Sequence, residues 1–173
     1  MQAKIFGAIL IIFTAYWYGV LIGSKYKNRV KNLESLLIAM EMIHAEINYG
    51  LTPLPEVFRK IGQSISKPVG ALFLRTSREM ESCRGKSALE CWTDAVNVHK
   101  IELEFNEKQL EQLEKLGMVW GKGNKSGQLK QVVLIQSFVR HALQSANHEL
   151  EKNDKLWRYL GLLGGITLVI FLL

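Results

Sequence analysis

The chain has 173 residues, of which 48% are hydrophobic, and it carries a formal net charge of +6 at pH 7. A chain of this length can build one domain of modest size with its own hydrophobic core. The positive charge would suit either nucleic acid or anionic lipid as a partner. The basic stripe with interleaved aromatic residues that is typical of nucleic-acid binding is missing from the sequence. We therefore expect no nucleic-acid partner.

The first segment of the chain, residues 5–22, is apolar and contains no charged residue. Its 18 residues would form a helix about 27 Å long, close to the hydrocarbon thickness of about 30 Å. Aromatic residues at 16–18 form a band near its C-terminal end, and basic residues within 25–31 follow the segment, as interfacial anchors do. The sequence therefore predicts a transmembrane helix within residues 1–24. A cleaved signal peptide is the alternative, but the apolar run is long for one and no A-x-A site follows it.

Residues 25–49 have the periodicity of an amphipathic helix, and no proline separates them from the apolar segment. The predicted inner face recurs at alternating intervals of three and four residues and consists of Val30, Leu33, Leu37, Met40, His44 and Ile47. We expect His44 to be a buried or edge residue rather than a metal ligand, because no second histidine lies four residues away.

A glycine and two prolines mark the next connection. Gly50 is expected to end the preceding helix. Thr52 is predicted to be the N-cap, and Pro53 the first residue, of a short helix that ends near Gln63. A further helix is predicted from the segment around residues 66–68 to about residue 83.

Two capping-box patterns predict the starts of the following helices. Ser87 precedes Glu90 by three residues, and Asn106 precedes Gln109 by the same spacing. The glycine-rich residues 121–127 predict a loop. That loop lacks the G-x-x-x-x-G-K-[ST] pattern and a preceding strand, so it is not expected to bind a nucleotide.

A second long helical pattern starts at Gln128 and continues to Tyr159 without proline or glycine. Its predicted inner face consists of Leu129, Val132, Gln136, Val139, Leu143, Ala146 and Leu150. Residues 156–173 carry no charge except on Arg158, whose guanidinium can reach the lipid headgroups. They predict a second transmembrane helix.

Together these patterns predict an all-α protein, an antiparallel bundle of about six helices flanked by transmembrane helices at both ends. The predicted parts are residues 1–24, 25–155 and 156–173. Both long helices lead into membrane spans on the same side of the bilayer. We therefore expect them to pack antiparallel, with Val30 near Leu150 and Ile47 near Val132.

The sequence contains no convincing catalytic motif, and we expect no enzyme activity, cofactor or metal. His141 and His148 are seven residues apart, whereas a helical zinc site uses histidines four apart. Cys83 and Cys91 are eight apart, unlike a C-x-x-C pair. Two alternative functions stay open: a membrane-bound metal-binding protein or enzyme that uses His141 and His148, and an adaptor that binds anionic lipid.

One stretch of the sequence resembles a known family. Residues 46–56 read EINYGLTPLPE, and with the two apolar ends they resemble the stage III sporulation protein AB family of endospore-forming bacteria. Trp92 with Ala95, the glycine-rich loop that ends at Gln128, and the run LGLLGG at 160–165 extend the resemblance over the whole length. The soluble part of this family is similar to the inner-membrane platform domain of type II secretion and type IV pilus systems. The loop here lacks the acidic residue expected just before Gln128.

The resemblance implies a non-enzymatic component of the channel complex between mother cell and forespore. It implies a location in the outer forespore membrane, on the mother-cell side, with the helical domain in the cytoplasm. The implied partners are other stage III sporulation proteins, a cytoplasmic ATPase among them (stage III sporulation protein AA), and membrane lipid. The predicted partner-binding residues surround the first helix connection: Glu46, Tyr49, Thr52, Pro53 and Glu56. Cap, turn and core-edge roles are the structural alternative for all five.

Overall fold

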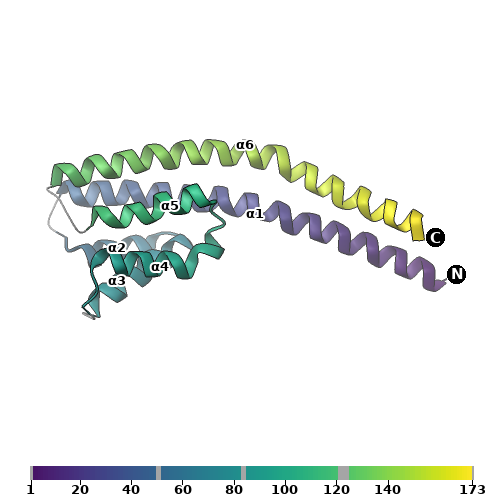
Figure 1. The fold of residues 1–173 in the computed structure, drawn as a ribbon, viewed down its shortest axis with the longest axis horizontal. Coiled ribbons are helices and arrows are strands. Elements are labelled where there is room, and N and C mark those ends of the chain that lie inside the picture. Colours follow the sequence, from purple (N-terminus) through teal and green to yellow (C-terminus); the bar gives the residue numbers. More distant parts are fainter. Residues whose placement is uncertain (1, 50–51, 83–84, 121–124, 173) are drawn as a thin grey trace. The chain divides into compact units, whose positions relative to one another are not determined.

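The computed structural model describes residues 2–49, 52–82, 85–120 and 125–172, and all regular structure in these ranges is helical. The elements are α1 (Gln2–Tyr49), α2 (Leu54–Ser64), α3 (Val69–Glu81), α4 (Ala88–Leu103), α5 (Glu107–Leu116), the 3-10 helix η1 (Gly117–Val119) and α6 (Lys125–Leu172) (Figure 1). The predicted all-α class and its six helices are confirmed for the described residues. Residues 25–49 continue the N-terminal helix without a break, as the absence of proline allowed.

Two compact units make up the chain. The terminal unit comprises residues 1–30 and 145–173, and the helical unit comprises residues 31–144. The long helices α1 and α6 each contribute one part to both units. The predicted boundaries at residues 24 and 155 stay a prediction.

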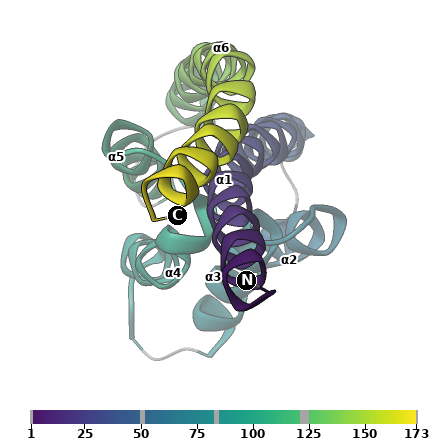
Figure 2. The ribbon, with the colours of Figure 1, turned by 90° about the vertical axis from the view of Figure 1, so that its right-hand side faces the viewer.

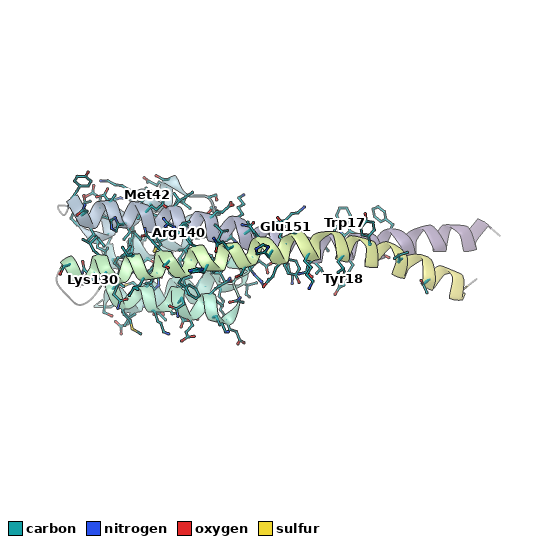
Figure 3. The ribbon with its side chains drawn as sticks, turned by 90° about the horizontal axis from the view of Figure 1, so that it is seen from above. Trp17, Tyr18, Met42, Lys130, Arg140 and Glu151 are labelled. Carbon is teal, nitrogen blue, oxygen red and sulfur yellow. The ribbon has the colours of Figure 1, made fainter. Side chains whose placement is uncertain are left out.

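In the terminal unit, the N-terminal part of α1 and the C-terminal part of α6 run side by side (Figures 1 and 3). Arg29 donates from Nη1 to Oε2 of Glu149 over 3.0 Å, and its guanidinium lies 5.9 Å from the centre of the Tyr26 ring. Arg29 and Glu149 are the neighbours in sequence of Val30 and Leu150. The ion pair therefore joins the two helices in the predicted antiparallel register.

Most side chains of the two predicted membrane spans lie outside the described part of the chain. Within the described residues, no helix combines the length and the apolar character needed to cross a membrane.

The helical unit is built around a cluster of four buried aromatic side chains. The Phe58 ring on α2 lies 5.3 Å from Phe73, 5.8 Å from Trp92 and 5.2 Å from Trp120, measured between ring centres. Most of these pairs are tilted or edge-on, which is the favourable arrangement for aromatic rings. The Trp92 indole donates from Nε1 to the carbonyl of Leu113 over 2.7 Å and so links α4 to α5. Helices α2, α3 and α4 lie next to one another around this cluster (Figure 2).

The parts of α1 and α6 in the helical unit are also antiparallel. The guanidinium of Arg140 lies 3.5 Å from the Glu41 carboxylate. Leu33 and Leu36 of α1 line one small cavity with Ile135 and Val139 of α6. The Asn32 side chain of α1 connects this helix to α4: it donates to the carbonyls of Glu102 and Leu103 over 3.3 and 3.0 Å. These carbonyls lie at the end of α4, where backbone acceptors lack partners within the helix.

The buried face of each long helix is rotated slightly from the predicted one. Val30, Leu33, Met40, Val132, Val139 and Ala146 are buried as predicted. Leu37, His44, Ile47, Gln136 and Leu143 are only half-buried, and Leu36, Ala39, Ile43 and Ile135 take the inner positions instead. A core-facing helix buries a wider stripe than a single file of residues at intervals of three and four. In α1, Leu36 and Ile43 are buried where the prediction had Leu37 and His44. In α6, Ile135 is buried where the prediction had Gln136.

The capping boxes of α4 and α5 are confirmed. Ser87 accepts from the backbone N–H of Glu90, and the Glu90 carboxylate accepts from the backbone N–H of Ser87 over 2.7 Å. These hydrogen bonds from Ser87 hold the pKa of Glu90 below its ordinary value. Asn106 and Gln109 make the same exchange at 2.9 Å in both directions.

The start of α6 differs from the prediction. The helix begins at Lys125, not at Gln128, so Lys125, Ser126 and Gly127 belong to its first turn rather than to the predicted loop. Residues 121–124 of that loop lie outside the described residues, as do Gly50 and Cys83. A glycine at 127 did not prevent helix formation, because one helical glycine costs only about 1 kcal/mol relative to alanine.

Candidate partner-binding site

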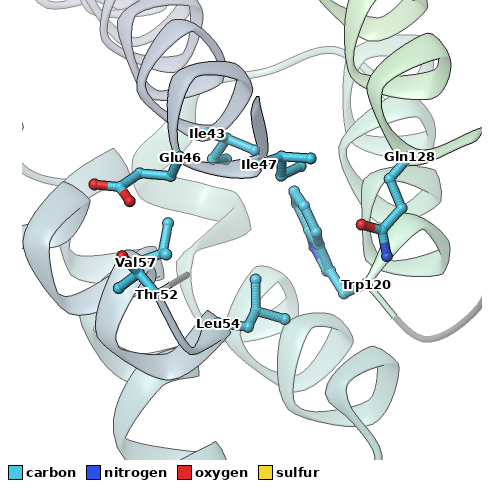
Figure 4. Close-up of a pocket in the computed structure, with 8 residues that line it drawn as sticks. All are labelled: Ile43, Glu46, Ile47, Thr52, Leu54, Val57, Trp120 and Gln128. Carbon is cyan, nitrogen blue, oxygen red and sulfur yellow. The ribbon is translucent and has the colours of Figure 1, made fainter. Parts of the chain in front are cut away.

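A cleft of about 280 Å³ lies at the end of the helical unit where α1 ends and α2 and α6 begin. Five apolar side chains and three polar ones form its walls (Figure 4): Ile43, Glu46, Ile47, Thr52, Leu54, Val57, Trp120 and Gln128. We call this the Glu46 cleft. It brings side chains from residues 43–57 together with Trp120 and Gln128, which lie more than 60 residues further along the chain.

Two of the five predicted site residues line this cleft. Glu46 stands on the last turns of α1, and Thr52 lies in the connection that leads to α2 (Figure 4). Tyr49 is the last residue of α1 and is 84% exposed, which is unusual for a side chain of its size. Pro53 and Glu56 stand at the start of α2. The structure thus gathers the five residues at one end of the bundle, and their role in binding stays a prediction.

Thr52 is not the N-cap of α2, and Pro53 is not its first residue. The helix starts at Leu54, with Pro53 as the N-cap and no side-chain capping bond. The sequence Thr-Pro-Leu-Pro holds two prolines two residues apart, and either can occupy the first turn of a helix. Pro55 takes that place here, which moves the boundary by one residue and leaves the Thr52 side chain in the cleft wall.

Alanine substitutions at Ser87 and Thr52 test whether Thr52 is a helix cap. Replacing Ser87 by alanine should lower the free energy of unfolding by about 1 kcal/mol, because its hydroxyl caps α4. Replacing Thr52 by alanine should change it by less than about 0.5 kcal/mol, because no cap is removed. Urea denaturation of both variants measures the difference. A loss as large for Thr52→Ala as for Ser87→Ala would restore Thr52 as the cap.

Among the described side chains beside the cleft, two carboxylates lie near one ammonium group. Lys60 Nζ lies 3.9 Å from Glu46 and 3.8 Å from Glu56, so two carboxylates share one ammonium group. Both distances exceed the 2.7–2.9 Å of a strong charge-assisted hydrogen bond. All three side chains are partly exposed. Glu46 therefore places a carboxylate in the wall of the cleft, with Glu56 and Lys60 close by.

Trp120 and Gln128 belong to the cleft but were not among the predicted site residues. Trp120 is only 8% exposed, and its indole Nε1 has no acceptor among the described residues. Gln128 stands on the first turns of α6, directly after the glycine-rich segment. This glycine-rich segment is the sequence feature that could have pointed to Gln128 as a site residue. Trp120 had no such signal, because its place beside α1 depends on how η1 packs.

Among the side chains that the structure describes, the other histidine and cysteine residues do not form a site with one another. His141 and His148 are exposed on α6, and His99 Nδ1 faces the Glu102 carboxylate at 3.4 Å. Among the described residues, no group of three histidine, cysteine or acidic side chains could hold a metal ion. Burial raises the pKa of the Cys91 thiol above its ordinary value, which disfavours the reactive thiolate.

The described part of the chain is thus an all-α bundle with a partly apolar cleft at one end. The family model for stage III sporulation protein AB matches residues 4–173, and the chain belongs to this family. It is 26% identical over 170 residues to stage III sporulation protein AB of Bacillus subtilis (strain 168), covering 98% of this chain and 99% of that protein. A solved structure of a stage III sporulation protein AB has the same fold, with a TM-score of 0.67 and 24% identity. That match covers 71% of this chain and 96% of the solved one.

Proposed function

We propose that this sporulation protein is a membrane-anchored assembly component of the channel complex between mother cell and forespore. In this proposal it has no catalytic role and docks a cytoplasmic ATPase, stage III sporulation protein AA, to the membrane parts of the complex. Membership of the stage III sporulation protein AB family supports the sporulation role. The resemblance of the family's soluble part to the platform domain of secretion systems supports the coupling role by analogy.

The observation that carries the docking role is the Glu46 cleft. It is concave and mostly apolar, and a few polar groups stand among its apolar walls, as in sites that bind a partner side chain. The Glu46 carboxylate in its wall adds a means of selecting the partner by charge. Two of the five residues that the sequence predicted for partner binding, Glu46 and Thr52, line this cleft, which supports the proposal.

The anchoring role is supported by the surface of the terminal unit. Phe13, Trp17, Tyr18 and Leu21 of α1 are all more than half exposed, and Phe13 stacks on Trp17 with ring centres 6.0 Å apart. Figure 3 shows Trp17 and Tyr18 projecting from α1. Exposed Lys25 and Lys27 follow within three turns. Aromatic rings beside cations are the usual anchors at a membrane interface, so we propose spans within residues 1–24 and 156–173.

A labelling experiment tests the proposed orientation. In a Cys83→Ser, Cys91→Ala background expressed in growing bacterial cells, Ser126→Cys should resist a membrane-impermeant maleimide, because the helical unit is proposed to be cytoplasmic. Gln2→Cys should react with the same reagent. Ser126→Cys should react once the cells are permeabilised. This control would show that the thiol itself is accessible to the reagent. Labelling of Ser126→Cys in intact cells would contradict the orientation.

A charge reversal in the cleft tests the docking role in cells. Glu46→Lys should reduce sporulation frequency strongly, because it turns the negative wall of the cleft positive. Glu34→Lys is the matched control, since Glu34 is exposed on the same helix and does not line the cleft. It should sporulate like the wild type. Both variants should accumulate to wild-type levels in an immunoblot, and equal sporulation of the two would contradict docking at this cleft.

A further inference from the structure

The Trp120 side chain in the wall of the Glu46 cleft carries a buried hydrogen-bond donor with no acceptor among the described residues. Trp120 is only 8% exposed, and its indole Nε1 is shielded from solvent. Trp92, the other tryptophan of the aromatic cluster, donates from Nε1 to the carbonyl of Leu113. A buried indole N–H normally has such an acceptor. Trp120 therefore departs from the usual pattern at the one place where its ring meets the cleft.

An unpaired donor of this kind destabilises the free chain and can strengthen the binding of a partner. Burial removes the N–H group from water, and without an acceptor nothing compensates for the lost hydration. The same ring packs edge-on against Phe58, with ring centres 5.2 Å apart, so its apolar part has a structural role in the core. Only the N–H group lacks one. A partner that supplies an acceptor in the cleft recovers the free energy that the free chain loses.

The backbone at Trp120 is held weakly enough for the indole to adjust. Trp120 is the C-cap of the 3-10 helix η1, and its backbone N–H donates to the Gly117 carbonyl over 3.4 Å. This distance exceeds the usual range of about 2.7–3.2 Å. Figure 4 shows the ring between Gln128 on one side and Ile47 and Leu54 on the other. Because Nε1 is buried in the free chain, a docked partner reaches it only when the indole turns slightly.

The other walls of the cleft limit the chemistry of the acceptor. Most of them are apolar, so the segment that carries the acceptor must itself be largely apolar. Glu46 places a carboxylate in the same cleft. An acidic acceptor would bring a second negative charge into this partly desolvated space, which like-charge repulsion disfavours. A neutral oxygen, such as a main-chain carbonyl, avoids this repulsion.

We propose that the Trp120 indole Nε1–H donates a hydrogen bond to a neutral oxygen acceptor of the docked partner protein, and that docking turns the indole to form this bond. Trp120 is then a specificity-determining residue of the Glu46 cleft, because a segment without an acceptor at this point leaves the donor unpaired. The inference rests on the proposed function, since it assigns the chemistry of the group that docks in the same cleft.

Replacing Trp120 by benzothienylalanine tests the inference with the full chain, because this analogue keeps the shape of the ring and has sulfur in place of the N–H group. Fluorotryptophan at the same position keeps the N–H group and is the matched control. Calorimetric titration of the chain in lipid nanodiscs measures its affinity for stage III sporulation protein AA. We expect the benzothienylalanine protein to bind at least about tenfold more weakly than the control, because the partner's acceptor loses its donor.

Two further measurements separate this role from a purely structural one. In urea, the benzothienylalanine protein should unfold at the same midpoint as the control or at a higher one, because the free chain has no hydrogen bond to lose. The fluorine resonance of the control should shift when the ATPase binds, because docking turns the indole. Glu46→Gln should bind no more tightly than the wild type, since a neutral acceptor is not repelled by Glu46.

The outcomes separate the inference from the proposed function. If the benzothienylalanine protein binds as tightly as the control while Glu46→Lys binds more weakly, the inference is wrong and docking at the cleft stands. A lower unfolding midpoint for benzothienylalanine would show that the N–H group has an acceptor within the free chain, which also overturns the inference. So would an unchanged fluorine resonance, or tighter binding by Glu46→Gln. If the wild type does not bind the ATPase, the proposed function itself fails, and the inference fails with it.

Discussion

Replacing Phe58 by alanine should lower the free energy of unfolding by about 4 kcal/mol, within the range for large aromatic residues in a packed core. Phe58 is fully buried, and three aromatic rings lie within 5.8 Å of its ring centre. The substitution leaves a cavity where α2 meets Phe73, Trp92 and Trp120, and it removes the favourable edge-on contacts. Because this cluster joins four elements, rearrangement of one neighbour cannot fill the space.

Urea denaturation of the full chain, followed by near-ultraviolet circular dichroism, measures this loss. Phe58→Leu is the matched control, since it keeps most of the apolar volume and should cost less than half as much. Trp120 forms a wall of the Glu46 cleft and contacts Phe58, so the alanine variant should also weaken partner binding. A loss below about 1 kcal/mol for Phe58→Ala would show that the cluster is not the centre of the core.

Replacing Gly70 by alanine should cost about 3 kcal/mol or more, at the upper end of the range for overpacking. A Cβ atom at this position would lie 2.2 Å from the carbonyl oxygen of Ile65 and 2.8 Å from that of Gly62. Both atoms belong to the backbone, so neither can move aside without shifting a helix end. Gly62 is similarly confined, with Leu74 Cγ 2.5 Å from its hypothetical Cβ. The two glycines therefore set how closely α2 and α3 approach.

Gly164→Ala provides the control for this prediction. Gly164 is also helical, but no atom lies within 4 Å of its hypothetical Cβ. Alanine there should leave the unfolding midpoint unchanged or raise it slightly, because alanine is the better helix former. Similar stabilities of the Gly70→Ala and Gly164→Ala proteins would contradict the close packing of α2 against α3.

The features that the sequence predicted well are those governed by local chemistry. The starts of α4 and α5 follow from Ser87 with Glu90 and from Asn106 with Gln109, because a capping box needs only residues three apart. The start of α2 was one residue off because two prolines competed for its first turn. Periodicity identified both long helices but not their rotation, since Leu36 and Leu37 differ only in what α4, α5 and α6 place against them.

The site was predicted only in part, because tertiary packing brings some of its residues together. Glu46 and Thr52 lie six residues apart, and the stretch between them resembles the family, so the sequence could associate them. Trp120 reaches the same cleft through the packing of η1, and Gln128 through the start of α6. The positions of Met118 and Leu134 likewise have no local sequence signal, because both follow the same apolar pattern as buried residues. Their exposure becomes visible only in the folded chain.

The most direct test of docking at the Glu46 cleft is the affinity of the purified full chain for stage III sporulation protein AA. Isothermal titration calorimetry of the chain in lipid nanodiscs would measure the dissociation constant for the wild type, Glu46→Lys and Glu34→Lys. We expect the wild type and Glu34→Lys to bind equally, and Glu46→Lys to bind at least about tenfold more weakly, a change of about 1.4 kcal/mol. Equal affinity of all three proteins, or no binding by the wild type, would contradict the proposal that this cleft docks the ATPase.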